Sequence, residues 1–338
     1  MTRSFAYCGN ERFVKEVEPR LVEAGFARVE DPASADVVVT YCSSQTALED
    51  LYFGDGGIVD QAAPGSLVID LSPMTPSFAR EVNAVATVSD LVMVEAPLVV
   101  ADMVAEPVYA RENLSCFVAG EGEGSEGAAE VLDALVSSVH EMGAPGNAQL
   151  ARAAYTIQIA AQVISAIEAE ALYRAARRSV TGSGLGELHA GAIGGQAASV
   201  LEAVLSNRFD GAYSVEQLMA ELSSAIMAAD DVELILPQAE AAMHLLELLA
   251  VIGGADKAPS SLSLIYGEEA DCAAQGLDWT RAEEAYGNGK SDDDLEDFDD
   301  CGCGHDHGRD HDDFDDYEGY GYDDPYNCLL YTSDAADD

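Results

Sequence analysis

The sequence predicts a doubly wound α/β domain with a parallel sheet, followed by an all-α domain and a disordered acidic tail. Short apolar runs alternate with helical stretches over residues 1–142, which is typical of a parallel sheet covered by helices. Helical patterns alone follow over residues 143–267. Residues 268–327 lose apolar density, and from Ser291 they consist mainly of Asp, Gly, Tyr and His, too polar to offset the entropy of ordering.

Six apolar runs are predicted as strands of the first domain. Several are continuous rather than alternating, as expected for parallel strands that are buried on both faces. The runs are SFAYC (4–8), ARVE (27–30), ADVVVTYC (35–42), SLVIDLS (66–72), LVMVEAPLVV (91–100) and SCFVAG (115–120). The helices predicted between them are Phe13–Ala24, Ser44–Tyr52 and Thr75–Ala84.

The second domain begins with a long helix, Ala148–Arg178, which is apolar nearly all the way round. Such a helix is typically buried inside a larger structure. Its most apolar part, Ile157–Ile167, is too interrupted by polar residues to predict a membrane span, so we expect no membrane partner. Three more helices are predicted, at Ala197–Leu205, Ser214–Ala229 and Leu236–Val251.

The charge of the chain excludes several partners. The formal net charge is −46. Residues 291–326 contain sixteen acidic residues and a single basic one, Arg309. A surface of this sign repels phosphate backbones and anionic membranes, so we expect no nucleic-acid partner. The first residues, MTRSFAYCGNERF, show no apolar signal segment, and four of the seven cysteines are scattered singly. Both features predict a reducing, cytoplasmic location.

The tail offers metal ligands. CGCGHDHGRDH supplies thiolates and imidazoles, which suit Zn²⁺, Ni²⁺ or copper. Because the C-x-C spacing is tighter than that of structural zinc sites, a scavenging tail is favoured over a folded site; the alternative is a solubilising acidic tail. The predicted ligands are Cys301, Cys303, His305, His307 and His311. Residues 328–338, CLLYTSDAADD, match the translation of a transposon-end sequencing adapter and are predicted to be an artefact.

An ordered run of motifs carries a family resemblance over residues 1–267. ADVVVTYCSSQTALEDLYFGDGGIVDQAAPGSLVIDLSPMTP (35–76) contains a strand ending in a loop, a GxGG-like turn, and a D-x-S-x-x-x-P segment. MVEAPLVV resembles a strand ending in A-P-V-S-G-G, GAPGNAQLARAAYT (143–156) resembles an interdomain helix, and GAIGGQAASVLE resembles the loop and helix after it. In these motifs the chain resembles the β-hydroxyacid dehydrogenase family, which includes 3-hydroxyisobutyrate dehydrogenases.

The resemblance implies a Rossmann domain that binds NAD or NADP on its strand ends, and an all-α domain. The implied reaction is hydride transfer between the nicotinamide and a small hydroxy acid, with a lysine of the interdomain helix exchanging the hydroxyl proton. The resemblance also implies a homodimer formed through the helical domain. Besides the phosphate loop, the residues it places beside the cofactor are Tyr41, Cys42, Ser43 and Ser72.

The phosphate loop departs from the family pattern G-x-G-x-x-G. In YCGNERF, Tyr7, Gly9 and Arg12 stand at the three glycine positions, with Asn10 between them. Two interpretations remain open. Either Arg12 meets the phosphate with its side chain, or the loop no longer holds a dinucleotide, because glycine is needed there for close backbone approach.

The segment from Gly25 to Asp36 has room for one short strand at most, so the adenosine side of the sheet is predicted to be truncated. Glu30 and Asp31 fall at the spacing from Gly9 at which an acidic residue binds the ribose 2′-hydroxyl, which favours NAD over NADP. The alternative is a pair of carboxylates in a surface turn.

Arg152 stands at the position of the family's catalytic lysine, with Tyr155 and Thr156 on its asparagine pair. A guanidinium stays charged throughout the working range of pH, so it does not replace a lysine that gives and takes a proton. Arg152 could instead clamp a carboxylate, or be a cation on a solvated helix turn. The resemblance places a second lysine near Ala220, and it places a substrate-binding S-G-G loop at residues 99–101.

Two functions are therefore predicted. One is an NAD(P)-dependent oxidoreductase for a small hydroxy acid, divergent at Arg152, which is either inactive or moves the proton through another group such as His189. The other is a non-catalytic regulatory protein of the same fold that binds a dinucleotide, a small acid or a metal.

Overall fold

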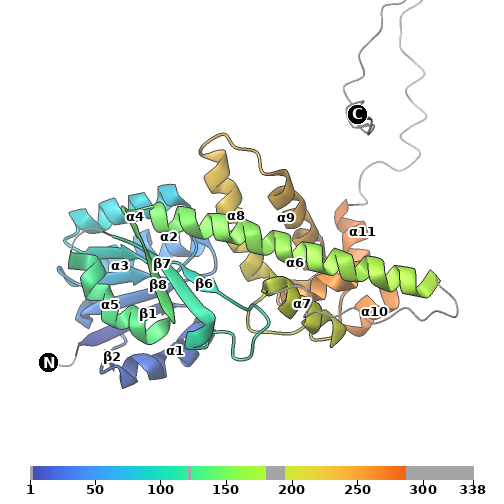
Figure 1. Ribbon diagram of the computed structural model, residues 1–338. Coiled ribbons are helices and arrows are strands. Elements are labelled where there is room, and N and C mark those ends of the chain that lie inside the picture. Colours follow the sequence, from blue (N-terminus) through green and yellow to red (C-terminus); the bar gives the residue numbers. More distant parts are fainter. Residues whose placement is uncertain (1–2, 121–122, 180–194, 287–338) are drawn as a thin grey trace, which may run out of the picture. The chain divides into compact units, whose positions relative to one another are not determined.

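A predominantly parallel sheet forms the first part of the chain (Figure 1). The computed structural model describes residues 3–120, 123–179 and 195–286. For residues 123–126 and 178–179 it describes the backbone alone. The strand order is β2-β1-β3-β4-β5-β7-β6, with β8 beside β7. The strands are β1 (Ser4–Gly9), β2 (Ala27–Arg28), β3 (Val37–Tyr41), β4 (Leu67–Asp70), β5 (Val92–Glu95), β6 (Leu98–Val100), β7 (Leu114–Gly120) and β8 (Ser138–Gly143).

The first five strands pair in parallel, as the continuous apolar runs predict. Helices connect them, namely α1 (Glu11–Glu23), α2 (Gln45–Phe53), α3 (Ile58–Gln61) and α4 (Pro76–Val88). Between Gly25 and Asp36 the chain forms only the two-residue strand β2 and a short 3-10 turn, Pro32–Ser34, which confirms the expected truncation.

The prediction of one strand over residues 91–100 is wrong. The run is divided into β5 and β6 at Ala96 and Pro97, because proline has no N–H to donate to a sheet ladder. Strand β7 is antiparallel to both β5 and β6, and it pairs in parallel with β8. The sequence analysis missed β8 and the helix before it, α5 (Glu123–Leu135).

The second part of the chain is helical. Its elements are α6 (Asn147–Ser179), α7 (Gln196–Leu205), α8 (Val215–Asp230), α9 (Pro237–Leu249), the 3-10 helix η5 (Pro259–Tyr266), α10 (Glu269–Ala274) and α11 (Thr280–Tyr286). Helix α6 contacts β7 and β8 of the sheet as well as α7, α8 and α9 (Figure 1). By length and composition alone, residues 147–177 of α6 could cross a bilayer; 44% of the apolar window is buried within the protein.

The predicted boundary of the ordered part at residue 267 is too early. Helices α10 and α11 continue to Tyr286, because this segment buries Cys272 of α10, Leu277 of the connection and Ala282 of α11. Trp279 Nε1 also donates to Cys272 Sγ at 3.2 Å. The remaining residues of the predicted tail, including its five metal ligands, lie outside the described residues.

Two apolar clusters cover the two faces of the sheet. Val37 and Val39 of β3 face the larger cluster, whereas Val38 faces the smaller one. The larger cluster continues into α6, α8 and α9, so the sheet and the helical part share one core. The carboxyl ends of β1, β3 and β4 meet this shared core, and ligands of open α/β sheets bind at such strand ends.

Candidate functional site

The loop between β1 and α1 satisfies its own backbone donors. Asn10 Oδ1 accepts hydrogen bonds from the backbone N–H groups of Arg12 at 2.8 Å and Phe13 at 3.2 Å, and so caps α1. The backbone N–H of Asn10 donates to the carbonyl oxygen of Tyr41 at 2.8 Å. In dinucleotide-binding folds such donors face the pyrophosphate. Here three of them are already bonded within the chain.

Gly9 is required by packing against the neighbouring strand. Its φ is +128°, and a Cβ built on it would lie 2.1 Å from the carbonyl oxygen of Tyr41. The retained glycine therefore allows close approach of β1 to β3.

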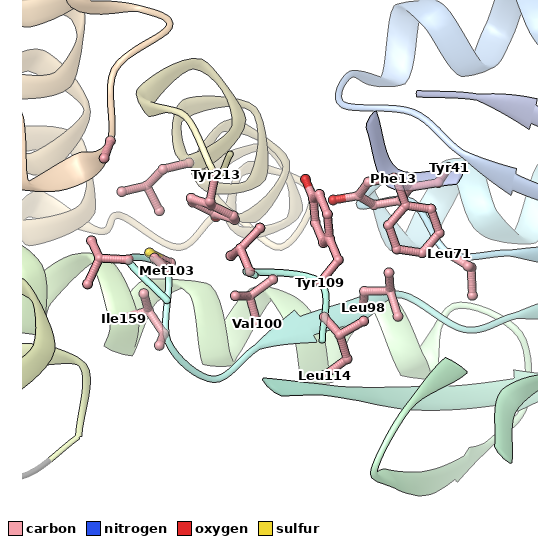
Figure 2. Packing of buried hydrophobic residues seen from close by; sticks show 14 of the residues in the cluster. Phe13, Tyr41, Leu71, Leu98, Val100, Met103, Tyr109, Leu114, Ile159 and Tyr213 are labelled. Carbon is pink, nitrogen blue, oxygen red and sulfur yellow. The ribbon is translucent and has the colours of Figure 1, made fainter. Parts of the chain in front are cut away.

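Aromatic side chains fill the space beside this loop. Phe13 lies 4.5 Å from the ring of Tyr41 and 5.2 Å from that of Tyr109, measured between ring centroids. Tyr7, at the first glycine position, stacks on Phe13 at 6.2 Å and donates its hydroxyl to the backbone oxygen of Asn10. Burial raises the pKa of the Tyr7 hydroxyl. Figure 2 shows Tyr109 between Phe13 and Tyr41 on one side and Tyr213 on the other.

A cavity of about 290 Å³ remains outside the aromatic cluster, and Arg12 and Ser43 line it. Its other charged lining residues are Glu11, Glu216 and Asp256. Three carboxylates against one guanidinium give the walls a net charge of −2, which repels a pyrophosphate. Arg12 is exposed and stands at the place where the sequence analysis put a phosphate contact.

The acidic pair proposed for the ribose lies in a surface turn. Glu30 is exposed and lies 3.6 Å from Arg28, measured between Oε1 and Nε. Asp31 is exposed as well, and its Oδ1 accepts from the backbone N–H of Ala33 at 2.9 Å. Neither residue lines the cavity at Arg12.

The loops after β3 and β4 are joined by buried hydrogen bonds. Ser72, which the resemblance placed beside the cofactor, accepts with its Oγ from the backbone N–H of Cys42 at 2.9 Å. Its own backbone N–H donates to Asp70, whose other carboxylate oxygen accepts from the hydroxyl of Tyr52 at 2.7 Å. Burial raises the pKa values of Asp70 and Cys42. Cys42 and Ser72 thus hold the two loops together, and Ser43 lines two cavities.

Arg152 lies in a buried ion pair. It is 4% exposed, so the prediction of a cation on a solvated turn is wrong. Its Nη2 pairs with the carboxylate of Glu221 on α8, which is also 4% exposed. Glu221 in turn accepts from the hydroxyl of Tyr213 at 2.7 Å.

The other donors of Arg152 are engaged nearby. Nε donates to the carbonyl oxygen of Leu98, and Nη1 donates to the hydroxyl of Thr156, one of the two residues at the asparagine positions. Tyr155, the second of them, is half-buried, with its ring centroid 5.9 Å from the guanidinium carbon. Burial lowers the pKa of Arg152, but the Glu221 carboxylate outweighs this and raises it above the ordinary value. Arg152 therefore holds its proton, and its Nε, Nη1 and Nη2 atoms already have partners.

A second set of buried bonds joins the sheet to α8 beside the ion pair. The side-chain amide of Gln217 donates to the hydroxyl of Tyr41, and its Oε1 accepts from the hydroxyl of Tyr109 at 3.3 Å. Burial raises the pKa values of both tyrosines. Both sets of bonds lie between the strand ends and α8, and two cavities, of about 470 and 290 Å³, remain beside them, each lined by Ser43 and Glu216.

The position of the substrate-binding S-G-G loop is occupied by strand β6 and the residue after it. Val99 and Val100 are buried, and Val100 and Ala101 direct their carbonyl oxygens to Gln196 Nε2 at 3.2 and 2.7 Å. The family's second lysine position, Ala220, has an apolar side chain. His189 lies outside the described residues, and no group of three or more His, Cys, Asp or Glu within the described ranges could hold a metal.

The sequence analysis missed Tyr109, Tyr213, Gln217 and Glu221. Glu221 directly follows Ala220, the position at which the family has its second lysine. This acidic residue was a signal in the sequence that a partner for Arg152 could lie there. Asn10 has the residue type of a helix cap directly before a predicted helix, which was a sign that the loop caps itself.

The fold and the position of this site define a class: two-domain proteins with a Rossmann-type domain and a helical domain that meet at the strand ends. Residues 10–144 match a family model described as the NAD-binding domain of 6-phosphogluconate dehydrogenase. The predicted resemblance is confirmed.

Curated relatives point to the same class. The chain is 26% identical over 306 residues to 3-hydroxyisobutyrate dehydrogenase of Pseudomonas aeruginosa, covering 85% of this chain and 94% of the relative. It is 26% identical to the uncharacterised oxidoreductase YkwC of Bacillus subtilis, covering 68% of this chain and 78% of the relative. A solved structure of Mycobacterium tuberculosis 3-hydroxyisobutyrate dehydrogenase, with L-serine, shares the fold at a TM-score of 0.62 and 21% identity, covering 79% of this chain and 100% of that chain. The chain is therefore similar in sequence to the NAD-binding hydroxyacid dehydrogenases and shares their fold.

The dinucleotide of that family fits this site poorly. The backbone donors of the loop are capped, Tyr7 stands at the first glycine position, and the adjacent cavity has acidic walls. No reaction step through a nicotinamide follows from this arrangement.

Proposed function

We propose that this chain is a non-catalytic binding protein that retains the fold of the hydroxyacid dehydrogenases without their hydride transfer. The observation that carries the proposal is the buried ion pair between Arg152 and Glu221 at the position of the catalytic lysine. Family chemistry needs a group there that releases and regains a proton at working pH. A guanidinium paired with a buried carboxylate does not do so.

Two further observations support the proposal. The hydrogen bonds that Gln217 makes to Tyr41 and Tyr109 lie beside the ion pair and join α8 to the first domain, so this side chain also has a structural role. At the position of the S-G-G loop, the carbonyl oxygens of Val100 and Ala101 accept hydrogen bonds from Gln196. A substrate carboxylate needs hydrogen-bond donors, and carbonyl oxygens are acceptors.

The test is a turnover assay of the full chain with NAD⁺ and with NADP⁺, against a panel of small 2- and 3-hydroxy acids, followed by nicotinamide absorbance. The 3-hydroxyisobutyrate dehydrogenase of Pseudomonas aeruginosa serves as the positive control. We expect no turnover above the rate without enzyme. Turnover that is lost in a Tyr155→Phe variant would instead assign the chain to the divergent oxidoreductases, with the half-buried Tyr155 hydroxyl beside Arg152 as the proton donor.

The proposal gives the two substitutions at the lysine and asparagine positions a structural role. Arg152 joins α6 to β6 and α8, and Thr156 accepts from its guanidinium. We expect Arg152→Lys to restore no activity while Glu221 remains in place to bind the ammonium group.

A further inference from the structure

A third cavity lies in the helical part of the chain and shares no lining residue with the two cavities lined by Ser43. Its volume is about 380 Å³. Its walls come from α6, from the end of α7 and the residues after it, and from the segment that runs from η5 through α10. A cavity of this size suits a small organic molecule.

One end of this cavity is polar and incompletely bonded. Glu170 on α6 lines the cavity and is 7% exposed, and its Oε2 has no hydrogen-bond partner. Arg174, one turn along the helix, forms an ion pair with Glu170, with Nη2 3.6 Å from Oε2, too far for a hydrogen bond. Buried polar atoms in folded proteins nearly always have a hydrogen-bond partner, so Oε2 offers an acceptor to a donor that enters the cavity.

Arg174 has a free donor at the same end. Its Nη2 donates to the carbonyl oxygen of Ser263 at 3.1 Å, which fixes the direction of the guanidinium. Its Nε is buried and has no acceptor. The cavity therefore presents one unmatched acceptor, Glu170 Oε2, and one unmatched donor, Arg174 Nε.

The rest of the lining is mixed. Its large apolar residues are Val204, Leu205, Phe209 and Leu264, and its uncharged polar residues are Asn207 and Gln275. Asp271 is exposed and adds a second carboxylate, so the charged lining residues sum to −1. A ligand for this cavity needs a cationic or donor group, an acceptor close to it, and an apolar substituent.

We propose that this cavity binds an apolar α-amino acid. The ammonium group of the ligand donates to Glu170 Oε2, its carboxylate accepts from Arg174 Nε, and its side chain packs on Val204, Phe209 and Leu264. The zwitterion supplies both missing partners with a single short backbone, and its apolar side chain is removed from water by the walls. This inference goes beyond the proposed function, because it holds whether or not the cleft at Arg152 turns over a substrate.

The experiment is isothermal titration calorimetry of the full chain with L-leucine, L-valine and L-phenylalanine. Two analogues of leucine separate the polar contacts, since isocaproate lacks the ammonium group and isopentylamine lacks the carboxylate. We expect saturable binding of at least one amino acid, and binding of each leucine analogue weakened about tenfold or more relative to leucine, as for the loss of a hydrogen bond to a charged group.

Matched variants then test the position. Glu170→Gln is expected to weaken amino-acid binding about tenfold or more, whereas Glu202→Gln, an exposed carboxylate on α7 that does not line the cavity, leaves the affinity unchanged. In the ligand-free protein Glu170→Gln should lower the free energy of unfolding by about 1 kcal/mol or less, because its partner Arg174 is 31% exposed, so weakened binding would not reflect unfolding.

The wild-type titrations decide the outcome even if a variant fails to fold. Absence of saturable heat with all three amino acids, or equal affinity for leucine and isopentylamine, overturns the proposal. Neither result depends on nicotinamide turnover, so failure here is distinguishable from failure of the proposed function.

Discussion

The ion pair between Arg152 and Glu221 predicts a large loss of stability when its negative partner is neutralised. Glu221→Gln keeps the shape of the side chain and an acceptor for the hydroxyl of Tyr213, so the change isolates the charge. The side chains of Arg152 and Glu221 are 5% and 3% exposed. Glu221→Gln therefore leaves the guanidinium buried without a counter-ion. Breaking a buried pair in this way costs about 3–5 kcal/mol.

Urea denaturation measures this loss as a lower midpoint with an unchanged m-value. The control is Glu216→Gln, an exposed carboxylate on the same helix, which should change the free energy of unfolding by about 0.5 kcal/mol or less. The double variant Arg152→Met/Glu221→Leu should be more stable than Glu221→Gln, because it leaves no unpaired charge. If Glu221→Gln costs no more than the control, Arg152 is not held by this pair and the reasoning about the site is wrong.

Three more changes test other parts of the account. Gly9→Ala should cost about 2 kcal/mol or more, because its Cβ would meet the Tyr41 carbonyl oxygen, whereas Gly25→Ala, with φ of +93° and no atom within 4 Å, should cost about 1 kcal/mol; equal losses in urea melts would refute the close approach. Burial raises the pKa of Glu95 from 4.5 to about 7, so its contribution to stability is complete below about pH 4.5 and is lost as the pH rises to about 7. This amounts to about 3 kcal/mol, and a Glu95→Gln variant whose pH profile of unfolding matches that of the parent chain would contradict it. For the tail, equilibrium dialysis should show Ni²⁺ and Zn²⁺ uptake that is lost from a chain truncated after Gly289; equal uptake would dispose of the predicted ligands Cys301, Cys303, His305, His307 and His311.

Much of the fold could be predicted because local patterns determine it. The run from Val37 to Tyr41 is apolar or β-branched at every position, and all five residues are buried in a parallel strand. Residues 91–100 were predicted as one strand because the run is apolar throughout most of its length. Pro97 ends the pairing of β5 because it has no backbone N–H to donate to a neighbouring strand. Helices α10 and α11 were missed because their few buried residues, such as Cys272, have too little apolar density to stand out in an acidic segment.

The sequence predicted which residues stand at the family's functional positions, but not the contacts that these residues make. The sequence places Arg152, Tyr7 and Arg12 at the family's functional positions, but it does not show what each side chain contacts. The partner of Arg152 comes from a distant helix, and its burial depends on how α6 packs against α8. The bonds from Gln217 to two tyrosines of the first domain likewise arise only in the folded chain.

The most direct test of the central claim is equilibrium binding of NADH and NADPH to the full chain by calorimetry, with Pseudomonas aeruginosa 3-hydroxyisobutyrate dehydrogenase titrated in parallel. The account predicts no saturable heat for this chain at millimolar dinucleotide, because Asn10 caps the loop donors and Tyr7 takes the place of the first glycine. Saturable binding of either dinucleotide that weakens in an Arg12→Ala variant would contradict it and restore Arg12 as a phosphate ligand.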